Sequence, residues 1–311
     1  MSRHRHGHGW IRSYRTRTCT VRVVLAVVLL LSGCRGVPST PVPPPGSAVT
    51  ARATPALRFP SGTSRAIGIT VDETGSVDPT QIDTALQQAG AWLLALVQPG
   101  QGRVEVNVWA ITSNSITDQN QLMDFSFGPV SLVPSPPSAV TPAATAAFTL
   151  NPRVRATETA AADQRARAAE AAAAAYQALL TEQTQQVQQV RDGLERQLTA
   201  LYAIRRPIDA HATDLQGAIA RQAAFLQQTA AAEQYLFIAT DLAQVGPQQV
   251  SQFTSLSGVH VVIDELCQTT AVSCDANRLR YQQVLRDLGA ASITVISPAD
   301  LAVIPNPFSA N

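Results

Sequence analysis

The pattern of hydrophobic and polar residues along this chain switches between two periods. Short runs of β-branched residues that alternate with polar ones, or that are apolar throughout, predict strands. They lie at residues 66–71, 103–112, 122–127, 235–239, 259–263 and 292–296. Apolar residues spaced three and four apart predict helices near residues 79–97, 215–226 and 277–288. Strands that alternate with helices favour an α/β fold, and we expect a doubly wound, mostly parallel sheet with helices on both faces.

This alternation is interrupted between residues 129 and 207. Six prolines in residues 129–152 predict a loop, whereas residues 153–204 hold almost only strong helix formers and predict one long helix. The alanine-rich first half of that helix has little to bury, but its second half carries a thin stripe of leucine and valine. We expect an exposed helical insertion whose C-terminal part packs on the domain. A coiled-coil stalk or a partner-binding arm is the alternative.

The first 65 residues differ in composition from the rest. An arginine- and histidine-rich start, residues 1–22, precedes nine consecutive apolar residues, which is the layout of a secretory signal. Leu31-Ser32-Gly33-Cys34 then resembles the bacterial lipobox. We therefore expect residues 1–33 to be a lipoprotein signal peptide and Cys34 to carry lipid, which anchors an exported protein to the outer face of a bacterial membrane. The alternative is an ordinary signal peptide whose cysteine is incidental.

A proline-, serine- and threonine-rich segment follows, and residues 34–65 read as a disordered tether because they lack the apolar residues of a core. The α/β pattern then divides into a first part at residues 66–128 and a second part at residues 208–302. Residues 303–311 are left as a tail.

Charge excludes several functions. All 23 basic residues are arginine, so a Schiff-base enzyme or a P-loop with its phosphate-binding lysine is excluded. Six of these arginines precede residue 34, where there is no acid, which leaves 17 arginines against 22 acids and a net charge near −5 for the remainder. An acidic body without a basic stripe argues against a nucleic-acid partner.

Oxygen-bearing side chains stand where predicted strands end and helices begin. Asp72, Thr74 and Ser76 follow the first strand, Thr213 lies beside a helix start, and Asp241 follows the strand at 235–239. Ligands of open α/β sheets bind at the carboxyl ends of the strands, and oxygen donors of this kind suit Mg²⁺. Because no histidine or cysteine joins them, zinc is disfavoured. Helix capping is the alternative role of these residues.

These residues resemble the von Willebrand factor A (VWA) domain and its metal-ion-dependent adhesion site. The family pattern is Asp-x-Ser-x-Ser after the first strand, a threonine on a later loop and an aspartate after the fourth strand. Asp72-Glu73-Thr74-Gly75-Ser76 matches the first part with threonine for one serine, and Thr213 and Asp241 match the others. The chain departs from the family in its long insertion and in having His211-Ala212 before that threonine.

The resemblance implies a Rossmann-like VWA fold that holds Mg²⁺ (or Mn²⁺ or Ca²⁺) and binds a protein partner, whose acidic side chain completes the coordination of the metal. It implies neither catalysis nor a small-molecule substrate. The residues agree, since a phosphotransferase of the haloacid dehalogenase type would need a second aspartate at Thr74, and Ser76 lies in no Gly-x-Ser-x-Gly elbow. The alternative function is a structural or assembly lipoprotein that acts through its helical insertion, with a non-functional metal site.

Two further features complete the predictions. Cys267 and Cys274 have six residues between them and are expected to form a local disulfide in an oxidising compartment, with free thiols as the alternative. His260 lies within an apolar strand and is expected to be a core histidine.

Overall fold

The computed structural model describes residues 62–136, 152–204, 212–243, 255–267, 271–297 and 300–309. The predicted signal peptide, the predicted lipid-attachment residue Cys34 and the tether up to residue 61 lie outside the described residues. So does most of the loop predicted for residues 129–152.

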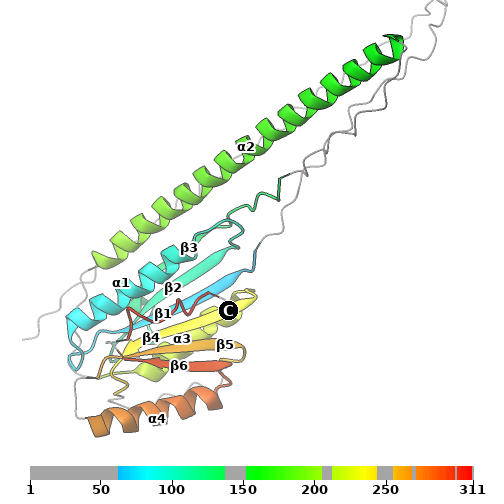
Figure 1. The fold of residues 1–311 in the computed structure, drawn as a ribbon. Coiled ribbons are helices and arrows are strands. Elements are labelled where there is room, and N and C mark those ends of the chain that lie inside the picture. The colour runs from blue at the N-terminus through cyan, green and yellow to red at the C-terminus, as the bar shows by residue number, and fades with distance from the viewer. Residues whose placement is uncertain are drawn as a thin grey trace, which may run out of the picture. The chain divides into compact units, whose positions relative to one another are not determined.

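Six strands form one sheet with the order β3-β2-β1-β4-β5-β6 (Figure 1). Each predicted strand is present, with bounds β1 Arg65–Asp72, β2 Val104–Ile111, β3 Gln121–Phe127, β4 Glu233–Thr240, β5 Val259–Glu265 and β6 Ser292–Ile296. All neighbouring pairs are parallel except β2 and β3, which are antiparallel. The structure thus confirms the α/β class and the mostly parallel sheet, and β3 lies at one edge of it.

Helices pack against both faces of this sheet. Their bounds are α1 Pro79–Ala95, α2 Pro152–Tyr202, α3 Leu215–Gln228 and α4 Ala271–Asp287. On one face, side chains of β1, β2 and β4 form a core with α1 and the C-terminal part of α2. On the other face, α3 and α4 bury Leu215, Ile219 and Tyr281 against the sheet. Within the described residues, no helix combines the length and the apolarity needed to span a bilayer.

The central strands are rich in β-branched residues because helices cover the sheet on both faces. Ile67, Ile69 and Val71 of β1 lie in the core beneath α1, while the preceding Ala66 faces α3. Such two-sided burial explains the near-continuous apolar runs of β1 and β4. The strand order places the C-terminal end of β1 in the middle of the sheet, between β2 and β4.

The long helix α2 is a structural insertion of two unequal parts. Residues 152–175 are all exposed, whereas Leu194, Leu198 and Leu201 are buried against α1 and β3. The Tyr202 hydroxyl also donates a hydrogen bond to the backbone oxygen of Leu86 in α1, at 3.4 Å. The expectation that only the C-terminal part of this helix packs on the domain is confirmed.

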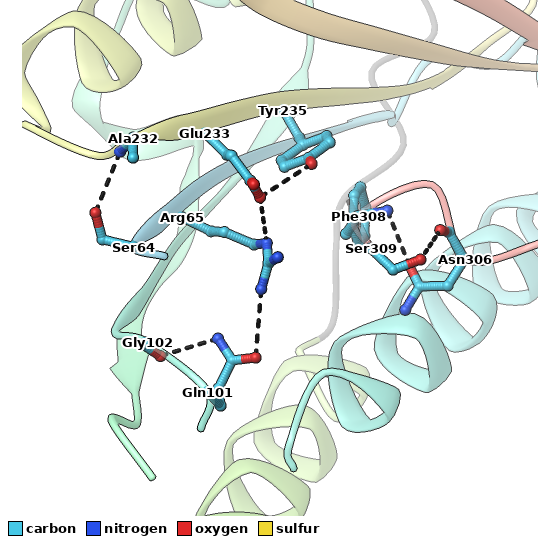
Figure 2. Close-up of polar contacts among 10 residues, drawn as sticks. All are labelled: Ser64, Arg65, Gln101, Gly102, Ala232, Glu233, Tyr235, Asn306, Phe308 and Ser309. Carbon is cyan, nitrogen blue, oxygen red and sulfur yellow. Dashed lines mark hydrogen bonds and ion pairs between the residues drawn. The ribbon is translucent and has the colours of Figure 1, made fainter. Parts of the chain in front are cut away.

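Two features of the C-terminal part of the domain differ from the predictions. The segment treated as a tail is packed, because Phe308 is fully buried between Trp92 of α1 and Tyr235 of β4. Figure 2 shows this segment, in which Asn306 caps the turn that holds Phe308. The C-terminal segment is packed because α1 and β4 leave an apolar space that the aromatic ring of Phe308 fills.

Helix α4 also differs from its prediction, since it begins at Ala271, six residues before the predicted start.

The domain also begins slightly before residue 66. Arg65 belongs to β1, and its Nε donates to Glu233 Oε2 of β4 at 2.6 Å, a half-buried ion pair that the Tyr235 hydroxyl joins at 3.3 Å (Figure 2). The placement of Arg65 in the tether was therefore wrong. Its charge is held by a strand partner that lies 168 positions away in sequence.

The prediction that His260 is a core histidine is wrong. Its side chain is exposed on β5, and Nδ1 lies 2.8 Å from Ser292 Oγ of β6. The strand is apolar, but on this face no described helix covers its first half. The ring instead lies beside Tyr235, with the ring centroids 5.4 Å apart.

Truncating the buried stripe of α2 tests how this helix is held. We expect Leu198→Ala to lower the free energy of unfolding by about 2–5 kcal/mol, because Leu198 is 3% exposed and its loss leaves a cavity between α1 and α2. Glu195→Ala changes an exposed neighbour on the same turn and should alter stability by less than about 0.5 kcal/mol. Urea denaturation of both variants makes the measurement, and equal effects would show that α2 is not packed on the domain.

Candidate metal centre

The candidate site is built around Asp72, the last residue of β1. Its side chain is fully buried, and both carboxylate oxygens accept hydrogen bonds. Oδ1 accepts from the Thr74 backbone N–H at 3.0 Å and from the Thr74 hydroxyl at 2.6 Å. Oδ2 accepts from the Thr240 hydroxyl at 2.6 Å, which ties the end of β1 to the end of β4. The acid is therefore fixed by both of the elements that surround it.

The predicted hydroxyls continue from this carboxylate as a chain. The oxygens of Thr74 and Ser76 lie 3.1 Å apart, and the Thr213 hydroxyl donates to Thr74 Oγ1 at 3.2 Å. Thr74 and Thr213 are buried, whereas Ser76 is exposed. The fold thus brings Asp72, Thr74, Ser76 and Thr213 into one hydrogen-bonded cluster at the carboxyl edge of the sheet, although Thr213 lies 139 positions from Thr74.

Asp241 lies beside this cluster, directly after β4, and it is 3% exposed. Its Oδ1 accepts from the Ala243 N–H at 2.8 Å, while the Leu242 N–H donates to the Thr240 hydroxyl at 3.0 Å. Leu242 has a φ of 58°, a left-handed conformation that residues other than glycine seldom adopt. Two side-chain bonds therefore hold the strained turn at Leu242.

A neighbouring acid, Asp214, explains how Thr213 reaches the cluster after a long insertion. The Asp214 N–H donates to the Thr112 backbone oxygen at 2.8 Å. Its Oδ2 accepts from the Ser115 N–H at 3.1 Å, and its Oδ1 accepts from the Gly217 N–H at 2.9 Å. Asp214 therefore caps α3 and joins that helix start to the loop after β2. Thr213, one residue earlier, is positioned by this link.

Burial controls the electrostatics of the cluster. The pKa of Asp72 is raised from 3.8 to about 6, chiefly because burial disfavours the charged carboxylate and also because Asp241 is a nearby negative charge. Hydrogen bonds from Thr240 and Thr74 oppose that shift of the pKa. A cation between the two acids would reverse both unfavourable effects, since opposite charge stabilises the ionised form.

The donor set fits a hard cation. Asp72 and Asp241 offer carboxylate oxygens, and Thr74, Ser76 and Thr213 offer hydroxyl oxygens, which are ligands that Mg²⁺ accepts. Within the part of the chain that the structure describes, no cluster of three or more histidine, cysteine, aspartate or glutamate side chains stands ready for a metal. Any metal here would therefore depend on the hydroxyls as much as on the two acids.

Two contributors to this arrangement escaped the sequence analysis. Thr240 bonds the second oxygen of Asp72, and Asp214 positions Thr213. Both are adjacent to residues that the sequence singled out, Asp241 and Thr213. Their position next to those residues is the one sequence feature that could have indicated them, because their hydrogen-bond partners come from distant strands and loops.

Asp264 on β5 is a further buried acid, and it lies outside the cluster. Its side chain is fully buried, and neither oxygen has a hydrogen-bond partner among the described residues. Burial raises its pKa from 3.8 to about 7. Beyond the end of β5, Cys267 and Cys274 are joined by the expected disulfide, with their Cα atoms 6.1 Å apart. This bond links the end of the strand to α4.

Comparisons with known proteins add little to this geometry. No model of a known protein family matches the sequence, and no curated protein matches it either. Among solved structures, the D319A mutant of the PilB minor pilin from Streptococcus sanguinis is similar at 9% sequence identity and a TM-score of 0.41. The match covers 78% of this chain and 60% of that chain. A likeness this weak carries no argument about fold or function.

The cap that positions Thr213 can be tested at a glycine. A Cβ added at Gly217 would lie 2.1 Å from Asp214 Oδ2, so Gly217→Ala must displace the carboxylate that bonds Ser115 and the helix start. We expect a loss of about 1–3 kcal/mol of stability, although alanine is the better helix former. Gly193→Ala on α2, whose nearest contact would be Arg196 at 4.0 Å, should instead gain up to about 1 kcal/mol.

Thermal denaturation of the two variants decides this prediction. A gain in stability for both glycine substitutions would mean that the Asp214 carboxylate does not hold the start of α3.

The pKa of Asp264 makes stability depend on pH. Because the folded-state pKa of about 7 exceeds the ordinary 3.8, this group costs no stability below about pH 4, and the protein loses stability as the pH rises from about 4 to about 7. The loss is on the order of 4 kcal/mol, since one pKa unit corresponds to about 1.4 kcal/mol. We expect Asp264→Asn to flatten this slope and to be the more stable protein at pH 8.

Urea denaturation at several pH values measures that slope, with Asp83→Asn, an exposed acid of α1, as the matched control. A slope that is the same in Asp264→Asn and in wild type would contradict the assignment. A slope that remains in part is expected, because the raised pKa of Asp72 acts in the same direction between about pH 4 and pH 6.

Proposed function

We propose that this chain is a divalent-metal-dependent protein-binding module of the VWA type. The observation that carries the proposal is the hydrogen-bonded cluster of Asp72, Thr74, Ser76 and Thr213, with Asp241 beside it, at the carboxyl edge of a parallel sheet. These are the five positions at which the sequence resembles a metal-ion-dependent adhesion site. Their meeting at one edge is what such a site requires.

The fold supports the same proposal. The strand order β3-β2-β1-β4-β5-β6 places β1 and β4 at the centre, where the strand order reverses and where ligands of open α/β sheets bind. Helices on both faces agree with a doubly wound, Rossmann-like arrangement. We infer that the chain is a VWA-like domain whose long helix is inserted between β3 and the loop that carries Thr213.

In this proposal Mg²⁺, or Mn²⁺ or Ca²⁺, is held by Asp72 and Asp241 and by the hydroxyls of Thr74, Ser76 and Thr213. The bound ion would supply a positive charge with an open position at the domain surface. An acidic side chain of a protein partner would fill that position, gaining a charge-assisted contact that depends on the metal. Ser76, the exposed member of the set, lies on the side from which a partner would approach.

Binding, not catalysis, is the proposed activity, and no small-molecule or nucleic-acid ligand is proposed. The sequence features at residues 1–34 support a location on the outer face of a bacterial membrane, where lipid on Cys34 and a tether would hold the domain. Display of a metal-dependent binding site at a distance from the membrane suits adhesion or assembly within a cell envelope.

A second candidate function rests on α2. Residues 152–175 of this helix are exposed along their whole length, so a partner could reach this segment from solvent. In this alternative the protein is a structural or assembly lipoprotein that acts through the helical insertion, and the metal site is non-functional. The two candidates differ in whether binding needs a metal.

Titration calorimetry with Mg²⁺ tests the metal site directly. We expect wild type to bind Mg²⁺ and Asp72→Asn to lose at least about tenfold in affinity, since a buried carboxylate is replaced by a neutral amide. Asp78→Asn is the matched control, because Asp78 follows in the same loop, is only partly buried and can still cap α1 as asparagine. No heat with wild type, or equal binding by Asp72→Asn, would remove the metal-dependent candidate.

A pull-down from a bacterial envelope extract then separates the two functions. Under the first, capture of a partner requires Mg²⁺ and fails with EDTA or with Asp72→Asn. Retention of the same partner under both conditions would favour recognition through α2.

A further inference from the structure

A groove of about 780 Å³ lies on the sheet face that α1 covers, away from the candidate metal centre. Its described lining comes from β4, β5, β6 and the C-terminal segment, and includes Tyr235, His260, Ser292, Thr294, Asp300 and Asn306. Figure 2 labels four of the lining residues, Glu233 and Tyr235 of β4 and Asn306 and Ser309 of the C-terminal segment. The volume is in the range of sites that hold ligands or peptide side chains.

The groove exists because this half of the face lacks a helix among the described residues. Here α1 and α2 cover the sheet from β3 to β4, and the C-terminal segment adds Leu301 and Phe308 to that core. Beyond them, His260, Ser292 and Thr294 are exposed. Their polarity matches a wetted surface, so the groove is not simply a core face that has lost its cover.

The groove runs beside β6, an edge strand without the usual protection. β6 pairs only with β5, and in the described parts of the chain no strand pairs with its outer side. Its sequence, Ser-Ile-Thr-Val-Ile, has high β-propensity and contains no charge, proline or glycine. Edge strands usually carry such residues because unpaired backbone N–H and C=O groups otherwise recruit another strand.

Charge in the groove is negative. Among its described lining residues are the carboxylates of Glu233 and Asp300 and no arginine. Glu233 is offset by Arg65, but Asp300 is exposed and accepts only from the Ser297 hydroxyl, at 2.7 Å, among the described hydrogen bonds. An acid without a cationic partner at the mouth of the groove is complementary to a basic side chain and repels an acidic one.

We propose that β6 and this groove bind an extended segment of a partner protein. The segment adds as a strand beside β6, where backbone hydrogen bonds supply affinity, and it places an arginine or lysine side chain in the groove near Asp300. This contact is independent of the proposed metal site, because it uses another face of the sheet and a partner residue of opposite charge. A basic segment here and an acidic side chain at the metal would together define a partner with both signs of charge.

The test uses the exported domain with its tether and two synthetic probes, a peptide of alternating valine and arginine and one of alternating valine and glutamate. Fluorescence polarisation is expected to show tighter binding of the arginine peptide, unchanged by EDTA. Asp300→Asn should weaken that peptide by about threefold to fivefold, the range of exposed ion pairs. Asp83→Asn, which removes an exposed acid of α1, should leave its affinity unchanged.

Two further measurements distinguish binding in the groove from nonspecific charge attraction. They are a second variant and a map of the residues that the peptide contacts. Thr294→Arg places a long basic side chain in the groove and should abolish binding of the arginine peptide. Amide chemical-shift changes on titration of wild type are expected in β6 and its neighbours. Equal binding of the two peptides, equal loss in Asp300→Asn and Asp83→Asn, or shifts confined to other surfaces would overturn the proposal. Loss of binding with EDTA would do so as well.

Discussion

The arrangement at the carboxyl edge of the sheet depends on one buried carboxylate. Asp72 sits at the end of the central strand, where a charged group loses its water, and it is retained because Thr74 and Thr240 donate to its two oxygens. These bonds tie β1 to its own following loop and to β4. In the proposed function, a bound cation would offset the cost of this buried charge. Fold and proposed function therefore draw on a single residue.

A second constraint allows the chain to carry a long insertion without disturbing that edge. Asp214 joins the start of α3 to the loop after β2 through its backbone and side chain. The intervening helix is tied down separately by Leu194, Leu198 and Leu201. A longer connection costs only slightly more loop-closure entropy. The contacts of Asp214 and of the buried leucines of α2 are therefore sufficient to hold the insertion. Thr213 is thus positioned through its neighbour Asp214, which bonds the distant loop after β2.

The two faces of the sheet are completed differently, and the difference leaves a free surface. One face is covered by α3 and α4, whereas the other is covered by α1, the end of α2 and a short C-terminal segment anchored by Phe308. A single aromatic residue covers less area than a helix. The strands β5 and β6 therefore keep polar side chains on that side, and a groove remains beside an edge that no described strand pairs with.

The sequence by itself determined the strands, the helices and the candidate donors, because hydrophobic period and strand-end acids are local signals. It also indicated that only the second half of the long helix would pack. Tertiary structure alone decided that Thr213 meets Thr74, that Thr240 and Asp214 support the cluster, that Phe308 belongs to the core and that His260 is exposed. Each of these depends on which distant segment lies opposite a residue. That pairing is fixed by the order and register of the strands, which no local pattern encodes.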